Sequence, residues 1–236
     1  MARFFNPQGT DGEKDARLHA PATARNRDAI LDVLKPALPA TGLIFEVASG
    51  SGEHAAYMAQ QLPNHQWQPS DIEEHHLKSI EAWRLDAGAS NILPAQHFDV
   101  MTDTFTDACF TDARFTDARF TDDCGPEGLA AVAAINLIHI APWEVAETLI
   151  KKAMSALSAE GILFLYGPYK REGRYTSISN EQFDMSLRSR NNGWGLRDME
   201  AVIEVAELAG FKTPSITPMP ANNFSLIFTQ KQSDKD

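Results

Sequence analysis

The stretch "EVASGSGEH", residues 46–54, decides how the rest of the chain is interpreted. It follows the apolar run "LIF" and precedes "AAYMAQQL", a segment with the composition of a helix. Two glycines in a turn of small residues between a strand and a helix allow the backbone to approach a ligand closely. The nature of that ligand is therefore the main question that the sequence poses.

Strand-like and helix-like segments alternate on both sides of this turn. The apolar and amphipathic patterns predict strands at 42–49, 66–71, within 91–100, at 129–140 and at 162–169, and helices at 21–38, 53–62, 72–88, 142–161 and 196–211. Two further strands, "TPSITPMP" and "NNFSLIFTQK", are separated only by a short loop and must therefore be antiparallel. This order predicts an α/β fold with a doubly wound, mostly parallel sheet that closes with antiparallel strands.

The chain is expected to form a single domain, residues 21–236, behind a polar N-terminal arm of residues 1–20. Its 236 residues, of which 43% are hydrophobic, are enough for one large core. The repeat "FTDACFTDARFTDARFTDD" at 105–123 interrupts the alternation. It holds nearly four five-residue units, too few to stack into a solenoid, so we interpret it as a surface loop lengthened by local duplication.

Composition and charge exclude several classes of protein. A net charge of −11 repels nucleic-acid phosphates, so nucleic acid is not an expected partner. No run approaches the roughly 20 apolar residues of a membrane span, and the N-terminus lacks the apolar segment of a signal peptide. Cys109 and Cys124 have neither metal nor redox spacing, and nothing else in the chain has the spacing of metal ligands. We therefore expect a soluble, cytoplasmic protein without a bound metal.

Three ligands compete for the glycine turn. A phosphate-binding loop requires a lysine after its last glycine, but Gly52 is followed by Glu53 and His54, which excludes this class. A dinucleotide site would use Gly50 and Gly52 as its first two glycines, with Ala55 in the third position. Glu53 would then oppose the pyrophosphate at the start of the helix. S-adenosylmethionine is cationic and has no phosphate, so it fits an acidic first turn better.

The pattern E-x-x-x-G-x-G, from Glu46 to Gly52, resembles the first motif of class I methyltransferases. The resemblance implies that Glu46 positions the methionine end of S-adenosyl-L-methionine and that the glycines let the backbone approach it. It also implies that Asp71, 19 residues after Gly52, holds the ribose hydroxyls, and that Asp99 and Val100 contact the adenine. The carboxyl ends of successive strands meet in one crevice of such a sheet. The cofactor-binding residues expected on this basis are Arg25, Asn26, Glu46, Ala48, Ser49, Gly50, Gly52, His54, Asp71, Ile72, Asp99, Val100 and Asn136.

Five segments together resemble one particular family. They are "APATARNRDAIL" at 20–31, "EVASGSGEHA" at 46–55, "WQPSD" at 67–71, "INLIHIAPWE" at 135–144 and "LYGPY" at 165–169. From about residue 20 onward, the chain is similar to a widespread methyltransferase-like family known only as a domain of unknown function. This resemblance implies a Rossmann-like, seven-stranded methyltransferase sheet and S-adenosyl-L-methionine as the cofactor. The repeat at 105–123 departs from the family, which has a shorter connection there.

The strand end "AINLIHIAPW", residues 134–143, supplies the polar candidates for catalysis. In the predicted fold, Asn136 and His139 face the transferred methyl group. His139 would accept a proton from the substrate or simply bind it, and the alternative is a structural role as a helix cap or as the partner of a backbone carbonyl. Tyr169 is expected to line the acceptor site. Trp143 is either an aromatic wall of that site or a packing residue.

Two further segments carry expectations. Residues 170–195 would form an extra element after the fifth strand, where it would cover the substrate as a lid. His75 and His76 are adjacent on a predicted helix, so their side chains point to different faces and are expected to be solvated.

The sequence thus favours an S-adenosylmethionine-dependent methyltransferase that acts on a small molecule by direct displacement. One alternative is an NAD-dependent oxidoreductase on a Rossmann core, against which Glu46 and the terminal antiparallel strands argue. Another is a non-catalytic cofactor-binding protein, which only a turnover measurement distinguishes. Neither the methyl acceptor nor the oligomeric state follows from the residues.

Overall fold

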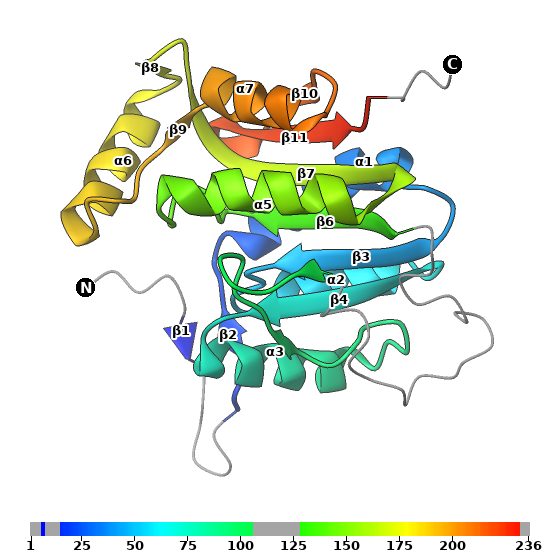
Figure 1. Ribbon diagram of the computed structural model, residues 1–236. Helices are drawn as coiled ribbons and strands as arrows, with labels where there is room; N and C mark the ends of the chain where they lie inside the picture. Colours follow the sequence, from blue (N-terminus) through cyan, green and yellow to red (C-terminus); the bar gives the residue numbers. More distant parts are fainter. Residues whose placement is uncertain (1–5, 8–14, 106–127, 232–236) are drawn as a thin grey trace, which may run out of the picture.

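The computed structural model describes residues 6–7, 15–105 and 128–231. Its centre is one sheet in which seven strands follow the order β10-β11-β7-β6-β3-β4-β5, and two short strands pair with β7 (Figure 1). The strands of this path are β3 (Gly42–Val47), β4 (His65–Asp71), β5 (Gln96–His97), β6 (Leu129–Ile135), β7 (Leu157–Arg171), β10 (Ser215–Met219) and β11 (Asn223–Thr229). The short strands are β8 (Arg174–Tyr175) and β9 (Arg197–Asp198). The repeat at 105–123 lies outside the described residues, except for Phe105.

The direction of the strands confirms the predicted doubly wound sheet. Strands β5, β4, β3, β6 and β7 run parallel, and β11 is antiparallel to both β7 and β10. Strand β3 lies between β4 and β6, so the order of the strands reverses beside it. In open α/β sheets, ligands bind outside the carboxyl ends of the strands at such a reversal.

Helices cover both faces of this sheet. They are α1 (Thr23–Leu34), α2 (Glu53–Gln61), α3 (Glu74–Ala87), α5 (Trp143–Ala156), α6 (Ile178–Arg190) and α7 (Met199–Ala209), with short 3-10 helices at Lys35–Ala37 and Pro220–Asn222. Helices α1 and α2 pack on one face and α5 and α7 on the other, while α6 lies beyond the end of β7 (Figure 1). In the described part of the chain, no helix is long and apolar enough to cross a membrane.

The buried strand β3 explains how the core is divided. Side chains alternate along a strand, so Leu43 and Phe45 join the core under α5 and α7, whereas Ile44 joins the core under α1 and α2. Both faces are covered, which is why the strand reads as a nearly continuous apolar run. Glu46 is the exception in this run, and it shares the face of Ile44.

Several elements differ from the prediction. The strand expected at 129–140 ends at Ile135, so Asn136 and His139 lie in the turn that follows it. The helix expected at 142–161 ends at Ala156, because Leu157 already pairs with Leu129 of β6 and begins β7. The strand expected within 91–100 is reduced to the two residues of β5. Pro94 lies just before β5 and has no N–H to donate to a neighbouring strand, which limits this edge of the sheet.

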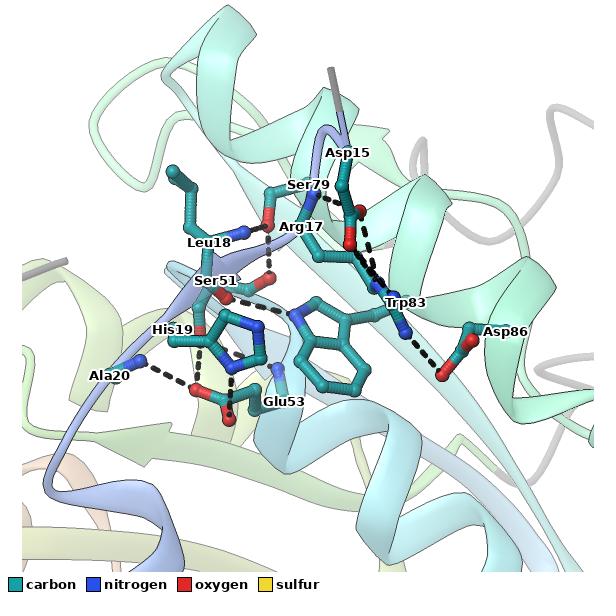
Figure 2. A network of polar contacts seen from close by, with 10 residues as sticks. All are labelled: Asp15, Arg17, Leu18, His19, Ala20, Ser51, Glu53, Ser79, Trp83 and Asp86. Atoms are coloured by element: carbon teal, nitrogen blue, oxygen red, sulfur yellow. Dashed lines mark hydrogen bonds and ion pairs between the residues drawn. The ribbon is translucent and has the colours of Figure 1, made fainter. Parts of the chain in front are cut away.

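The last residues of the expected N-terminal arm, residues 15–20, dock on the domain (Figure 2). The Leu18 amide donates to Ser79 Oγ at 2.8 Å, and the Leu18 carbonyl accepts from Trp83 Nε1 at 2.9 Å. Arg17 forms an ion pair with Asp86 of α3 at 2.6 Å. Strand β2 (Leu18–His19) also pairs with β1 (Asn6–Pro7). Several hydrogen bonds and an ion pair therefore connect this segment to α3.

Gly52→Ala is expected to lower the free energy of unfolding by more than about 2 kcal/mol. Gly52 has φ of +88°, and an added Cβ would lie 2.7 Å from the Ile80 Cα of α3. Gly88→Ala is the matched control, because Gly88 has φ of +59° but no atom within 4 Å of an added Cβ. We expect this control to cost only about 1 kcal/mol. Chemical denaturation of both variants measures the difference, and equal losses would contradict the close contact with α3.

Candidate active site

The glycine turn follows β3 directly and has an unusual backbone. Ala48, Gly50 and Gly52 all have positive φ, of 56°, 59° and 88°. A positive φ is strained for alanine, and such strain is concentrated at functional sites. The Ser49 amide donates to the Ser70 carbonyl at 2.8 Å, which ties the turn to the end of β4. Contacts with neighbouring segments thus stabilise a backbone conformation that the isolated chain would disfavour.

The carboxylate of Glu46 contacts this turn through Ser49. Its side chain is 1% exposed, and its Oε2 accepts hydrogen bonds from Ser49 Oγ at 2.8 Å and from Trp67 Nε1 at 3.0 Å. Burial raises the pKa of Glu46 to about 7, although the two hydrogen bonds act in the opposite direction. The Asp71 charge raises this pKa further. A pKa of about 7 places the change of charge of Glu46 near neutral pH.

Asp71 joins the end of β4 to the glycine turn. Its Oδ2 accepts from the Gly50 amide at 2.9 Å, and its Oδ1 accepts from the Glu73 amide at 3.0 Å and lies 3.1 Å from His76 Nδ1. Burial alone would raise the pKa of Asp71, but the hydrogen bonds from His76 and the two amides outweigh it and lower the pKa. Asp71 is therefore ionised at neutral pH and fixes the position of the turn.

His76 corrects an expectation from the sequence. It was expected to be solvated, like His75, but its ring is mostly buried and bonds to Asp71. His75 is exposed, as predicted. The sequence contained one signal for this role, because His76 lies five residues after Asp71, within reach across the start of α3.

Other residues of this network were not predicted at all. Trp67 and Ser70 both bond to Glu46, and Ser70 Oγ donates to the Glu46 carbonyl at 2.7 Å. Ser79 of α3 donates to the Ser51 carbonyl at 2.6 Å and accepts from the docked N-terminal segment (Figure 2). The only available signal was the position of Trp67 and Ser70 inside the segment "WQPSD", on the strand beside β3.

Glu53 was expected to set the charge at the start of α2, but its carboxylate is bound by the N-terminal segment. It accepts from the Ala20 amide at 2.5 Å and lies 3.3 Å from His19 Nδ1 (Figure 2). The Ser51 hydroxyl also donates to it, at 3.4 Å. The acid in this first turn therefore anchors the chain before α1.

The expected adenine side has two exposed apolar side chains. Ile72, directly after Asp71, is 54% exposed, and Met101 is 48% exposed. Asp99 is half-buried, and its carboxylate accepts from the Met101 amide at 2.8 Å. Val100 differs from the expectation, because its side chain belongs to the hydrophobic core.

Asn26 and His54 form a buried pair between α1 and α2. His54 Nε2 lies 2.9 Å from Asn26 Oδ1, which is the geometry of a hydrogen bond donated by the imidazole. Burial lowers the pKa of His54 to about 4, and the nearby charge of Arg27 acts in the same direction. His54 is therefore neutral and holds the Asn26 amide in place. Arg25, one residue earlier on α1, is exposed.

Asn136 and His139 follow β6 on the other side of β3. Asn136 has φ of +61°, and its amide donates to the Tyr166 carbonyl of β7 at 2.8 Å. His139 is 3% exposed, and its Nδ1 has no hydrogen-bond partner among the described residues. Burial lowers the pKa of His139 to about 3, with the Arg197 charge acting in the same direction. The site thus contains a neutral imidazole with an unused polar atom.

Tyr169, expected to line the acceptor site, is more buried than predicted, whereas Trp143 packs as one of its two expected roles requires. Tyr169 is fully buried in the core under α5 and α7, so its side chain lies away from the surface of the site, and burial raises its pKa. Trp143 is half-buried at the start of α5 and packs against the same core. This contact supports the alternative of a packing residue for Trp143.

The segment expected as a lid is helix α6 with the chain around it. In Figure 1, α6 lies at the edge of the sheet where β3 and β4 end, and β2 lies at the same edge. The Phe183 ring of α6 lies edge-on to His139, with 5.7 Å between ring centroids. The described residues contain no group of three His, Cys, Asp or Glu side chains that could hold a metal ion.

Glu46→Gln is expected to change how stability depends on pH. The folded pKa of about 7 lies above the unfolded value of 4.5, so the wild type loses stability as pH rises through this interval. The variant lacks this loss. Its free energy of unfolding relative to wild type should therefore rise by up to about 3 kcal/mol between these pH values and stay constant above them. Urea denaturation from pH 4.5 to 8.5 measures it, with Glu160→Gln, an exposed site, as control.

A pH-independent difference between Glu46→Gln and wild type would contradict the titration of Glu46 in this range. The comparison uses the slope with pH, because the amide that replaces the carboxylate also changes stability by an amount that does not depend on pH.

Solved methyltransferase structures share this fold. Human N-acetylserotonin methyltransferase in complex with SAM matches with a TM-score of 0.69 and 12% identity over 89% of this chain and 53% of that one. An O-methyltransferase family 2 protein from Planctomyces limnophilus in complex with apigenin gives a TM-score of 0.69 and 16% identity over 89% and 60%. CalO1, a methyltransferase in calicheamicin biosynthesis in its SAH-bound form, gives 0.65 and 14% over 89% and 54%.

The chain spans between half and two thirds of the length of these structures. Identities this low support the fold alone, which is the predicted Rossmann-like methyltransferase sheet with its antiparallel C-terminal strands. The model of one protein family, described as "Protein of unknown function (DUF938)", matches residues 17–230. The match begins within the docked N-terminal segment and covers nearly all of the described residues. The chain therefore belongs to the DUF938 family.

Proposed function

We propose that this protein binds S-adenosyl-L-methionine and transfers its methyl group to a small-molecule acceptor by direct displacement. One observation carries the proposal: the carboxylates of Glu46 and Asp71 flank the glycine turn at the ends of adjacent strands. Solved neighbours with the same fold are complexes with SAM or SAH, which supports the cofactor. One neighbour is a complex with the small molecule apigenin, which supports the class of acceptor.

The two carboxylates have acceptor capacity left for a ligand. Both side-chain hydrogen bonds found for Glu46 among the described residues go to Oε2, so Oε1 can accept from an ammonium group. Asp71 Oδ2 accepts one hydrogen bond, from Gly50, and retains a lone pair for a ribose hydroxyl. The exposed Ile72 would then lie beside the adenine. Asn26, held by His54, and Asn136 remain candidates for the methionine end.

When bound, S-adenosyl-L-methionine supplies an electrophilic methyl group on a sulfonium. The protein must then align the nucleophile and exclude water, rather than form a covalent intermediate. His139 suits alignment, since its unpartnered Nδ1 accepts a hydrogen bond from an O–H or N–H group only while the imidazole is neutral. Its pKa of about 3 favours this orienting role over complete removal of a proton.

Two alternatives make different predictions for binding. An NAD-dependent oxidoreductase would bind NAD and not S-adenosylmethionine, and a non-catalytic protein would bind S-adenosylmethionine without turnover. We expect calorimetry to show binding of S-adenosylmethionine and S-adenosylhomocysteine with dissociation constants of about 1 to 100 μM and no binding of NAD. Binding of NAD alone would refute the proposal.

The affinity for S-adenosylmethionine should depend on pH through Glu46. A cationic ammonium binds the ionised carboxylate, so the affinity should fall by up to about tenfold per pH unit below the pKa of about 7. Glu46→Gln should bind weakly at every pH, whereas the exposed control Glu160→Gln should follow the wild type. Calorimetry in two buffers of different ionisation enthalpy measures the proton released on binding near pH 6. An affinity that is equal at pH 6 and pH 8 would remove Glu46 from the cofactor site.

His139→Ala should separate methyl transfer from cofactor binding. We expect its dissociation constant for S-adenosylhomocysteine to stay within about twofold of wild type and its turnover of an acceptor found by screening to fall by about 100-fold. The measurement is transfer of a radiolabelled methyl group at saturating cofactor. Full activity of the variant would leave His139 with a structural role only.

A further inference from the structure

One distant segment of the chain, residues 193–197, forms hydrogen bonds with the turn that carries His139. Residues 136–142 connect β6 to α5, and three carbonyls of this turn accept hydrogen bonds from residues 195 and 197. Arg197 Nε donates to the Ile138 carbonyl at 3.0 Å, and its Nη2 donates to the Ala141 carbonyl. The Gly195 amide donates to the His139 carbonyl at 2.9 Å. Each of these bonds joins positions more than fifty residues apart in the sequence.

A guanidinium is suited to this task. Its donors lie in one rigid plane, so Nε and Nη2 of Arg197 reach two carbonyls of the same turn at once. The Nη2 group also donates to the Gly193 carbonyl at 2.7 Å, which closes the segment on itself. The Arg197 guanidinium carbon lies 5.8 Å from the centre of the Trp143 ring, at the start of α5. A lysine would carry the same charge but could not bridge both carbonyls in this geometry.

Helix α6 fixes the same segment through Asp184. This carboxylate is 1% exposed and accepts from the Leu196 amide at 2.6 Å, Arg188 Nε at 2.8 Å and the Tyr175 hydroxyl at 2.8 Å. Gly195 has φ of +143°, and a Cβ there would lie 2.7 Å from Asp184 Oδ1. The segment is therefore closely fitted between α6 and the turn with His139, and the position of α6 constrains both.

We propose that Arg197 is a positioning residue that holds His139 at the acceptor site, and that Asp184 links helix α6 to the same turn. The inference rests on the proposed role of His139 in methyl transfer. It assigns no contact with substrate to Arg197, which acts only through the carbonyls of the turn. Phe183 of α6 also contacts the His139 ring. If a bound acceptor displaced α6, the displacement would therefore affect His139 through Phe183 and through Asp184.

The Arg197 guanidinium also has an electrostatic effect on His139. Burial is the main reason for the low pKa of His139, and the Arg197 charge lowers it further. The other charged groups close to Arg197 are Arg188 and Asp184 of α6 and Glu144 of α5. Arg197 therefore acts on His139 through geometry and through charge, and two substitutions separate these effects.

The test compares Arg197→Lys, which keeps the charge, with Arg197→Gln, which removes it. Arg171→Lys is the matched control, because Arg171 makes an exposed ion pair with Glu200 and lies outside the site. Hydrogen exchange of the Gly195 amide reports its bond to the His139 carbonyl. The ¹³Cε1 resonance of His139, followed from pH 2 to 8 so that the range includes its pKa of about 3, reports the environment and protonation of the imidazole. S-adenosylhomocysteine affinity, measured by calorimetry, checks that the cofactor side is intact.

We expect Gly195 exchange at least about tenfold faster in both Arg197 variants and unchanged in Arg171→Lys. The His139 resonance should shift in both variants, but its pKa should rise only in Arg197→Gln. S-adenosylhomocysteine affinity should stay within about twofold of wild type. Unchanged Gly195 exchange and an unchanged His139 resonance in both variants would overturn the proposal.

A replacement variant and a measurement on the wild type complete the test. If Arg197→Gln does not fold, Asp184→Asn replaces it, since this change keeps an acceptor for the Leu196 amide and weakens the contact with Arg188. Faster Gly195 exchange in Asp184→Asn supports the link to α6, and wild-type exchange refutes it. Failure of the proposed function would appear separately, as a wild type that binds no S-adenosylhomocysteine.

Discussion

The hydrogen bond from the Gly50 amide to Asp71 is the contact on which the site depends. It joins the glycine turn after β3 to the end of β4, at the place where the strand order reverses. A buried, ionised carboxylate requires donors, and Gly50, Glu73 and His76 supply them. The bond from Gly50 therefore helps to keep Asp71 charged and also ties the positive-φ turn to the end of β4. The position of the glycine turn and the charge of Asp71 thus both depend on this hydrogen bond.

The sheet was predictable from the sequence because its signals are local. An apolar run such as "GLIFEV", followed by glycines and a helix, indicates a buried strand and its turn whatever lies elsewhere in the chain. The acids Glu46 and Asp71 could be placed at strand ends for the same reason. Adjacent parallel strands then bring their carboxyl ends together, so the candidate site followed from topology without knowledge of any side-chain contact.

The partners of these residues were not predictable, because they are contacts between distant segments. Glu53 is bound by the chain before α1, and His76 turns back to Asp71 instead of facing solvent. Tyr169 follows the pattern of a site residue but lies in the core, since alternation along β7 directs its side chain under α5 and α7. Arg197 lies 59 and 56 residues from the two carbonyls of the turn that it binds, and no spacing rule relates such positions.

Burial shifts the pKa values of Glu46 and His139, two of the ionisable groups at the site, in opposite directions. It raises the pKa of Glu46 to about 7 and lowers that of His139 to about 3, so in each case it favours the neutral form. A cationic ligand reverses this only for Glu46, because a positive charge stabilises a carboxylate and destabilises an imidazolium. Binding of such a ligand would therefore charge one side of the site and keep the other neutral. If the ligand is S-adenosylmethionine, as we propose, Glu46 would anchor its cationic end while His139 remains an uncharged hydrogen-bond acceptor for the substrate.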